Sequence, residues 1–225
     1  MRFQDAARDG RAVVYAGIQA DPLVKRAAAL LAEATPAQRV LARAVMNGET
    51  TDPVGWMAMF PTLFGSSVAA GADRARSEAI LAASVAVADR GEQVRSQFRG
   101  AIVEELTAML LARRVGEDAV RRERRILFDG VRSEIHPYDV TVERDGRAEA
   151  YDCKWGARGI NDDVLHQLDD ARGHAAAEDE PLRVALVVFD AERSCGVRLD
   201  RLNAPRDGTA IVPLESLDRI AEGPP

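Results

Sequence analysis

The stretch that decides the fold is residues 137–155, which read PYDVTVERDGRAEAYDCKW. At its centre stands Asp145-Gly146, a pair that favours a tight turn between two antiparallel strands. We therefore expect a β-hairpin, with Asp139 on its first strand and Asp152 on its second. The twelve residues between these aspartates suffice for two short strands and a turn, so the hairpin can bring the two carboxylates side by side.

The second strand of this hairpin should have two different faces. Side chains alternate along a strand, so Asp152 and Lys154 share one face, and Tyr151, Cys153 and Trp155 share the other. The latter three can pack into a core, which leaves the opposite face to present charge. A charged pair on a central strand is costly to bury unless something compensates it, and a bound divalent cation would do so.

The segments around the hairpin alternate between helical and strand patterns. Residues 96–115 form a strongly apolar helix that ends at Gly116. Arg183 to Asp190 is almost continuously apolar, so it should be a central strand that is covered on both faces. The other expected elements are strands at 125–128, 133–143 and 210–212, a turn at Asp129-Gly130, a helix at 162–177 and a short helix from Pro213. This order predicts a mixed α/β layer.

The first part of the chain has a helical pattern instead. Residues 23–45 carry apolar side chains at helical spacing, with a break and a new helix start at Thr35-Pro36. Residues 72–88 favour a further helix. Between them lies a turn-rich apolar segment, residues 51–65. That segment either packs into the helical core or forms a surface that binds a partner.

The hairpin and its surroundings resemble the signature of the PD-(D/E)XK nuclease superfamily. Pro137-Tyr138-Asp139, the hairpin, and then Asp152-Cys153-Lys154 match its motif, with Asp in the (D/E) position. Members of this family place a helix before the hairpin, with a glutamate near the site that often follows a glycine. Glu104, after Gly100, matches that arrangement, and Glu105 is the competing choice.

This resemblance covers about Gln93 to Leu217. It implies a restriction-endonuclease-like fold, a mixed β-sheet flanked by helices and preceded by an α-helical N-terminal region. We accordingly expect two domains, a helical region at 1–92 and a nuclease-like domain at 93–225. The helical region would serve partner binding, oligomerisation or substrate positioning.

The resemblance also assigns chemistry to the motif residues. It implies Mg²⁺-dependent or Mn²⁺-dependent hydrolysis of phosphodiester bonds, with 5′-phosphate and 3′-hydroxyl products. Asp139, Asp152 and the backbone carbonyl of Cys153 would bind the metal, because hard cations prefer oxygen ligands. Glu104 would complete the metal shell directly or through water, or hold a second ion. Lys154 would orient or help to deprotonate the attacking water and contact the phosphate.

Gln167 is a further candidate catalytic residue, on the helix that follows the motif. Some branches of the family use a glutamine at this place, close to the site, and a tyrosine four residues later. This chain has Ala171 instead of that tyrosine, so it departs from the branch pattern. A glutamine on the helix surface is the alternative interpretation.

The charge balance limits how nucleic acid could bind. The formal net charge is -6 over 225 residues, which argues against binding of nucleic acid through overall electrostatics alone. A local basic surface remains open, since arginines crowd into one short stretch. That stretch is either a solvated helix end and loop or a surface that contacts phosphates. Its members are Arg113, Arg114, Arg121, Arg122, Arg124, Arg125 and Arg132.

Other residue types exclude several classes of protein. Two cysteines, Cys153 and Cys195, are too few for a disulfide framework or a structural zinc site, and Cys153 is expected to be a small buried residue. His136, His166 and His174 lack the spacing of a metal-binding helix. Without an apolar leader or a membrane-spanning run, we expect a cytoplasmic protein that does not contact membranes.

Three functions follow from these patterns. The first is a DNA-cleaving enzyme, a restriction or anti-phage defence effector by the habits of the family, although no residue distinguishes DNA from RNA. The second is a catalytically silent nuclease fold that binds within a larger nucleic-acid-processing complex. In the third, the helical region binds a protein partner or a second copy of the chain and controls a latent nuclease.

Overall fold

The computed structural model describes residues 1–6, 10–129, 131–132, 136–205 and 210–223. The chain divides into two compact units. The sheet unit comprises Met1–Asp9 and Thr107–Pro225, and the helical unit comprises Gly10–Leu106. The sequence predicted a division at 92/93, whereas the structure divides the chain inside helix α7 (Glu92–Val115) and assigns the N-terminal residues to the sheet.

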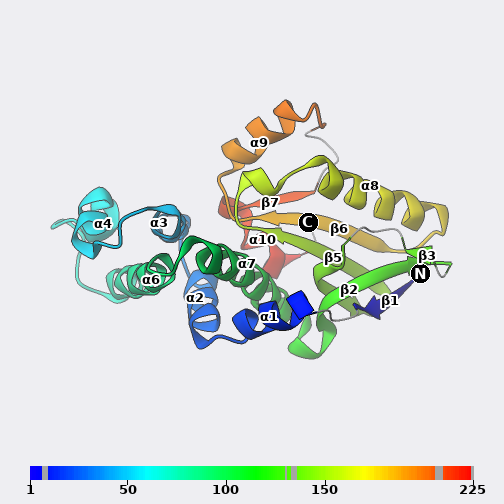
Figure 1. The fold of residues 1–225 in the computed structure, drawn as a ribbon, viewed down its shortest axis with the longest axis horizontal. Coiled ribbons are helices and arrows are strands. Elements are labelled where there is room, and N and C mark those ends of the chain that lie inside the picture. Colours follow the sequence, from blue (N-terminus) through cyan, green and yellow to red (C-terminus); the bar gives the residue numbers. More distant parts are fainter. Residues whose placement is uncertain (7–9, 130, 133–135, 206–209, 224–225) are drawn as a thin grey trace. The chain divides into compact units, whose positions relative to one another are not determined.

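The sheet unit is built on one mixed β-sheet, as the sequence predicted (Figure 1). Its strands follow the order β1-β2-β4-β5-β6-β7, and β3 pairs with β2. The pairs from β1 to β5 are antiparallel, and β5-β6 and β6-β7 are parallel. The bounds are β1 Arg2–Asp5, β2 Val120–Phe128, β3 Val131–Arg132, β4 Tyr138–Arg144, β5 Arg147–Lys154, β6 Leu182–Val188 and β7 Ile211–Pro213.

Two helices cover one face of this sheet. Helix α8 (Asp162–Ala177) and helix α9 (Glu192–Arg201) share an apolar core with β2, β4, β5 and β6. The last turns of α7 contact the opposite face, where Thr107 lies 3.5 Å from the Cys153 sulfur. Strand β6 is buried from Val184 onward because it lies between β5 and β7 with helices on its face. The prediction of a central, covered strand is confirmed.

The hairpin predicted within residues 137–155 is confirmed in detail. Strands β4 and β5 pair from Val140 with Tyr151 to Arg144 with Arg147, which leaves Asp145 and Gly146 as the turn. Both turn residues have positive φ, 52° and 72°, as a two-residue turn that follows the sheet twist requires. Glycine adopts this conformation without strain, and aspartate tolerates it better than most residues.

Several parts of the sheet unit have no clear signal in the sequence, among them β1, β3, α9 and the first half of β2. Strand β1 is too short to show an alternating pattern, and α9 contains few apolar side chains, of which Cys195 and Leu199 are buried. Strand β2 begins at Val120 rather than at residue 125, because its first half consists largely of arginines. The predicted strand at 133–143 begins at Tyr138; its residues 133–135 lie outside the described part of the chain.

The remaining elements are the 3₁₀ turns η1 Glu117–Ala119, η2 Ala157–Gly159 and η3 Leu214–Ser216, and helix α10 Arg219–Glu222.

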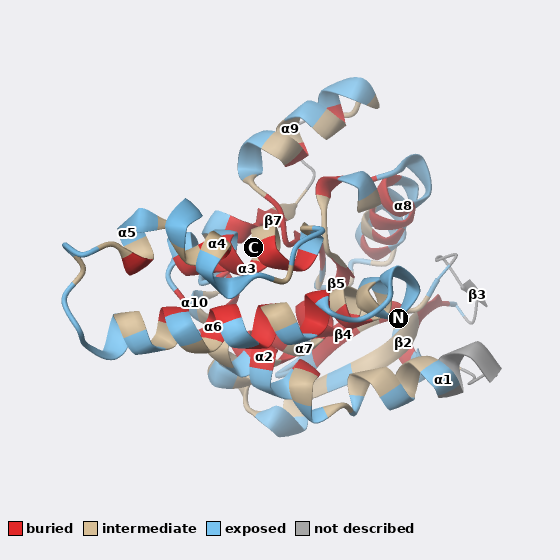
Figure 2. Cartoon of the chain, turned by 60° about the vertical axis from the view of Figure 1, so that its left-hand side comes forward, coloured by how far each residue is buried: buried red, intermediate tan, exposed pale blue. Residues whose placement is uncertain are grey.

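The helical unit confirms the helices expected at residues 23–45 and 72–88, and it adds a helix at residues 10–19 that the sequence did not predict. Their bounds are α1 Gly10–Gln19, α2 Pro22–Ala32, α3 Pro36–Asn47, α4 Pro53–Met59, α5 Pro61–Phe64 and α6 Ala72–Ala88, followed by the first part of α7. Buried stripes on α2, α3 and α6 show as red bands in Figure 2. The apolar segment at 51–65 forms α4 and α5, and Trp56 and Phe64 are buried there. Val54 and Met59 remain exposed, so this segment contributes to the core and also presents an apolar surface.

Thr35 starts α3 with a capping box. Its hydroxyl accepts a hydrogen bond from the Gln38 backbone, and the Gln38 side chain accepts one from the Thr35 backbone, 2.9 Å away. The Gln38 amide also donates to the Asp73 carbonyl and to the Ser77 hydroxyl, so the cap is tied to α6. The break predicted at Thr35-Pro36 is therefore a helix start.

The Thr35→Ala substitution should lower the free energy of unfolding by about 1 kcal/mol, because the hydroxyl that accepts the Gln38 N–H at the start of α3 is lost. Urea unfolding followed by circular dichroism measures this change. Thr62→Ala is the matched control, since Thr62 is exposed on α5. Equal stability of both variants would contradict a role for the Thr35 cap.

Among the residues described, no helix combines the length and the apolar character needed to cross a membrane.

Candidate active site

The candidate site lies where β4 parts from β5. The antiparallel pairing of these strands starts at Val140 with Tyr151, whereas β5 stays paired with β6 up to Lys154. Asp139 stands just beyond the last pair, and its Oδ2 accepts a hydrogen bond of 2.6 Å from the Cys153 backbone N–H. A side-chain carboxylate thus replaces a backbone carbonyl at the point where the two strands separate.

Asp152 and Lys154 form the second part of the site. Lys154 Nζ lies 2.7 Å from Asp152 Oδ1, and Asp152 is buried while Lys154 is partly exposed. Burial by itself lowers the pKa of Lys154, but the charges of Asp152 and Asp139 outweigh it and hold the pKa above its ordinary value. Lys154 is therefore an ammonium group paired with Asp152 and influenced by the charge of Asp139.

The two faces of β5 differ from the expectation. Tyr151 and Cys153 are buried, as predicted, but Glu149 lies on their face, where it accepts hydrogen bonds from Tyr151 and from Arg114. The face of Asp152 begins with Ala148 and Ala150, which belong to the core under α8. Charge is therefore present on both faces, and on the Asp152 face it is confined to the carboxyl end of the strand. Trp155 stacks on Phe189, with ring centroids 4.8 Å apart.

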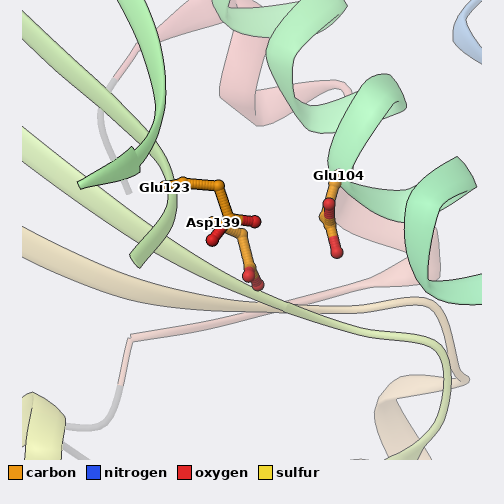
Figure 3. Close-up of side chains that lie close together, drawn as sticks. All are labelled: Glu104, Glu123 and Asp139. Carbon is orange, nitrogen blue, oxygen red and sulfur yellow. The ribbon is translucent and has the colours of Figure 1, made fainter. Parts of the chain in front are cut away.

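Glu123 is the residue that the sequence analysis missed. On β2, Arg122 pairs with Val140 and Arg124 with Tyr138, so Glu123 lies opposite Asp139. The two residues offer carboxylate oxygens within 4.8 Å of each other. Figure 3 draws these two side chains together with that of Glu104, which comes from α7.

The backbone of Glu123 is unusual for a strand. Its φ is 52°, in the left-handed region that residues other than glycine seldom adopt. Such conformations cost on the order of 1–3 kcal/mol and cluster at functional sites. Its carbonyl accepts from the Ala6 N–H at 2.9 Å, which joins the end of the β1 segment to this distorted position.

Glu104, rather than Glu105, is the buried glutamate of α7. Its carboxylate accepts hydrogen bonds from the Tyr15 hydroxyl at 2.5 Å and from the Gln19 amide at 2.8 Å, both on α1. These contacts lie within the helical unit, and α7 continues from Glu104 into the sheet unit without a break. A buried carboxylate with two donors is a fixed group, in keeping with the residue type that the resemblance requires.

Gln167 is buried on α8, not on the helix surface. Its side-chain oxygen accepts from the His136 N–H at 3.2 Å, and its side-chain nitrogen donates to the His136 carbonyl at 3.1 Å. The Tyr138 hydroxyl donates to the Gln167 carbonyl. Gln167 therefore fastens the segment that leads into β4, three residues before Asp139.

The remaining sequence candidates have other surroundings. Both cysteines are buried free thiols, which confirms that Cys153 is a small buried residue. His136, His166 and His174 are exposed, and His174 stacks on Phe128. In the arginine-rich stretch, Arg114 pairs with Glu149, and Arg124 pairs with Asp5 and Glu143. The stretch therefore combines the end of α7 with strand β2, where a loop was expected, and its contact with phosphates stays a hypothesis.

A sequence signal for Glu123 did exist. It is the one acidic residue inside the run Arg121 to Arg125, and a carboxylate there interrupts an otherwise basic segment. The predicted strand began only at Arg125, which placed Glu123 outside the sheet. A strand that begins at Val120 pairs with the hairpin so that Glu123 lies opposite Asp139.

Comparison of the chain with protein-family models, with curated proteins and with solved structures found no match.

Proposed function

We propose that this chain is a Mg²⁺-dependent nuclease that hydrolyses phosphodiester bonds, with DNA as the expected substrate. The observation that carries the proposal is the cluster of side chains at the point where β4 separates from β5. We call this point the fork, and its residues are Glu123, Asp139, Asp152 and Lys154. There, a carboxylate–lysine pair with 2.7 Å between Asp152 and Lys154 adjoins Asp139, which is held by the Cys153 backbone. This is the constellation that the PD-(D/E)XK resemblance implies. The role in restriction or anti-phage defence is part of the same expectation.

The residues at the fork fit a magnesium ion. Mg²⁺ binds oxygen ligands at about 2.0–2.1 Å, so ligands on opposite sides of it are about 4 Å apart. The oxygens of Glu123 and Asp139 lie within 4.8 Å of each other, which is close to that spacing. Two carboxylates this close repel each other, and a cation between them relieves the repulsion.

The sequence-based ligand set changes in one respect under this proposal. Glu123 joins Asp139 as a ligand, and Glu104 stays in the set as the sequence predicts. Asp152 and the Cys153 carbonyl also stay, but the short contact of Asp152 with Lys154 gives it a second task, to fix the position of the ammonium group.

Each residue then has a defined part in hydrolysis. When bound, the cation neutralises the phosphate and lowers the pKa of a bound water. Asp139 and Glu123 hold negative charge where that cation binds. Lys154 donates to the phosphate or to the attacking water, and its fixed position stabilises the charge that develops in the transition state. Gln167 holds the start of β4 so that Asp139 keeps its place.

The composition of the chain supports a special role for Lys154. Lys25 and Lys154 are the two lysines, and the other 28 of the 30 Lys and Arg residues are arginines. Arginine spreads its charge over a broad planar fork, whereas the lysine ammonium is a compact point charge that can approach a water molecule or a phosphate oxygen closely. A lysine at the fork, in a chain that otherwise relies on arginine, fits a chemical requirement for an amine.

The proposal is tested by incubating the purified full chain with supercoiled plasmid and with labelled single strands. Cleavage is expected with Mg²⁺ or Mn²⁺ and should stop with EDTA, and the new ends should carry 5′-phosphates. Cleavage that persists in EDTA would contradict metal-dependent hydrolysis. Intact substrates across divalent metals would overturn the assignment of the isolated chain as an active nuclease.

Glu123→Gln should raise the Mg²⁺ concentration for half-maximal cleavage by about ten- to hundredfold, the range typical of lost metal-site partners. The change keeps the side-chain size and removes the charge. Glu117→Gln is the control, because Glu117 is exposed on η1, a short distance before β2. An unchanged Mg²⁺ requirement of the Glu123→Gln variant would remove Glu123 from the ligand set.

A further inference from the structure

A basic cavity lies next to the fork, inside the sheet unit. It has a volume of about 560 Å³, within the range of ordinary ligand clefts. Turn η2 forms one wall and helix α9, labelled in Figure 1, forms the other. Its lining consists of Ala157, Arg158, Arg193, Ser194, Val197, Arg198 and Arg201. We call this cavity the η2–α9 groove.

The groove concentrates positive charge in an acidic chain. Among the residues described, its lining has four arginines and no acidic side chain, although the net charge of the chain is -6. Arg193 and Arg201 are exposed two turns apart on α9, and Arg158 is exposed on η2. Arg198 donates to the Ile160 carbonyl at 2.7 Å, which fixes its side chain. Guanidinium groups bind phosphates through paired hydrogen bonds, so these side chains suit a phosphate-rich ligand.

The wall of the groove also touches the proposed catalytic lysine. A β-carbon at residue 159 would lie 2.8 Å from Lys154 Cβ and 3.0 Å from its Cδ, so only glycine allows η2 to pack this closely on the lysine stem. The Asp190 carboxylate accepts from the Ala157 N–H at 2.9 Å and holds the other end of η2 against β6. A ligand in the groove would therefore lie one short turn away from Lys154.

We propose that the η2–α9 groove binds the phosphate backbone of the nucleic-acid strand whose phosphodiester reaches the fork. This inference rests on the proposed function and extends it, because it assigns the substrate path to four arginines outside the motif. Backbone contacts position a strand without reading its sequence. The groove therefore gives affinity, while the fork performs the reaction.

The test is binding of a short labelled duplex and single strand, in EDTA, by fluorescence anisotropy across a series of KCl concentrations. The Arg193→Gln/Arg201→Gln variant should bind more weakly to every sequence, and its salt dependence should decrease by about one unit per lost phosphate contact. Glutamine keeps the helix propensity of α9. Ser194→Glu, which adds a negative charge without removing an arginine, should also weaken binding.

The control is Arg76→Gln/Arg172→Gln, which removes two arginines that form ion pairs within their own helices. Its affinity and salt dependence should match those of the wild type. Unchanged binding by both groove variants, or no binding by the wild type, would overturn the groove assignment. Cleavage is measured separately with Mg²⁺. If binding depends on the groove arginines but no cleavage occurs, the groove assignment is supported and the nuclease assignment is overturned. If cleavage occurs but binding does not depend on these arginines, the nuclease assignment is supported and the groove assignment is overturned.

Discussion

Lys154→Ala is expected to slow metal-dependent cleavage by about 10²- to 10⁴-fold, the range for loss of a positioned acid–base or charge-stabilising group. The variant removes the ammonium that lies 2.7 Å from Asp152. The rate is measured under single-turnover conditions with saturating Mg²⁺, so that weaker binding of metal or substrate does not mask the chemical step.

Two further lysine variants separate the possible causes of that loss. Lys154→Arg keeps a positive charge but cannot release a proton, so activity retained in it would assign Lys154 to charge stabilisation alone. Lys25→Ala removes the other lysine of the chain, which is exposed on α2, and should cleave at the wild-type rate. A Lys154→Ala variant as fast as the wild type would exclude Lys154 from the reaction.

Asp139→Asn should reduce cleavage by about 10²-fold or more, since one charged group at the site of developing charge is lost. An asparagine oxygen can still accept the hydrogen bond from the Cys153 N–H that the structure gives to Asp139, so the fork should keep its shape. The variant should therefore fold normally but respond weakly to metal. Its melting temperature should rise less on addition of Mg²⁺ than that of the wild type, because a ligand stabilises only the state that binds it.

Asp169→Asn is the matched control for this experiment. Asp169 is exposed on α8 and pairs with Arg172, so its loss should change neither cleavage nor the response to Mg²⁺. An Asp139→Asn variant with wild-type cleavage and a wild-type thermal response would show that the metal binds elsewhere. If the variant is unfolded in the absence of metal, the main role of Asp139 is structural, as the acceptor of the hydrogen bond from the Cys153 N–H.

The predictable parts of this fold are those with strong local signals. The Asp145-Gly146 pair specifies its turn through backbone conformation alone, and the helix at 162–177 has the bounds that its pattern predicts. Strand β6 was identified by an apolar run that needs cover on both faces. In each case the information lies within a few consecutive residues.

The parts that escaped prediction depend on residues far apart in the sequence. Glu123 comes opposite Asp139 only through the pairing of β2 with β4, and no local pattern records that pairing. The sequence allows Gln167 to lie either at the site or on the helix surface, whereas in the structure it is buried and hydrogen-bonded to the His136 backbone. The boundary between the two units inside α7 was not predicted either. The helix is continuous across that boundary, so the amino-acid composition does not change there.

The most direct test of the account is plasmid cleavage by the purified chain in Mg²⁺, with Lys154→Ala and Asp152→Ala prepared in parallel. The account predicts metal-dependent nicking and linearisation by the wild type and loss of both activities in the two variants. Equal cleavage by all three proteins would show that the activity does not come from the fork of β4 and β5, and would contradict the central claim.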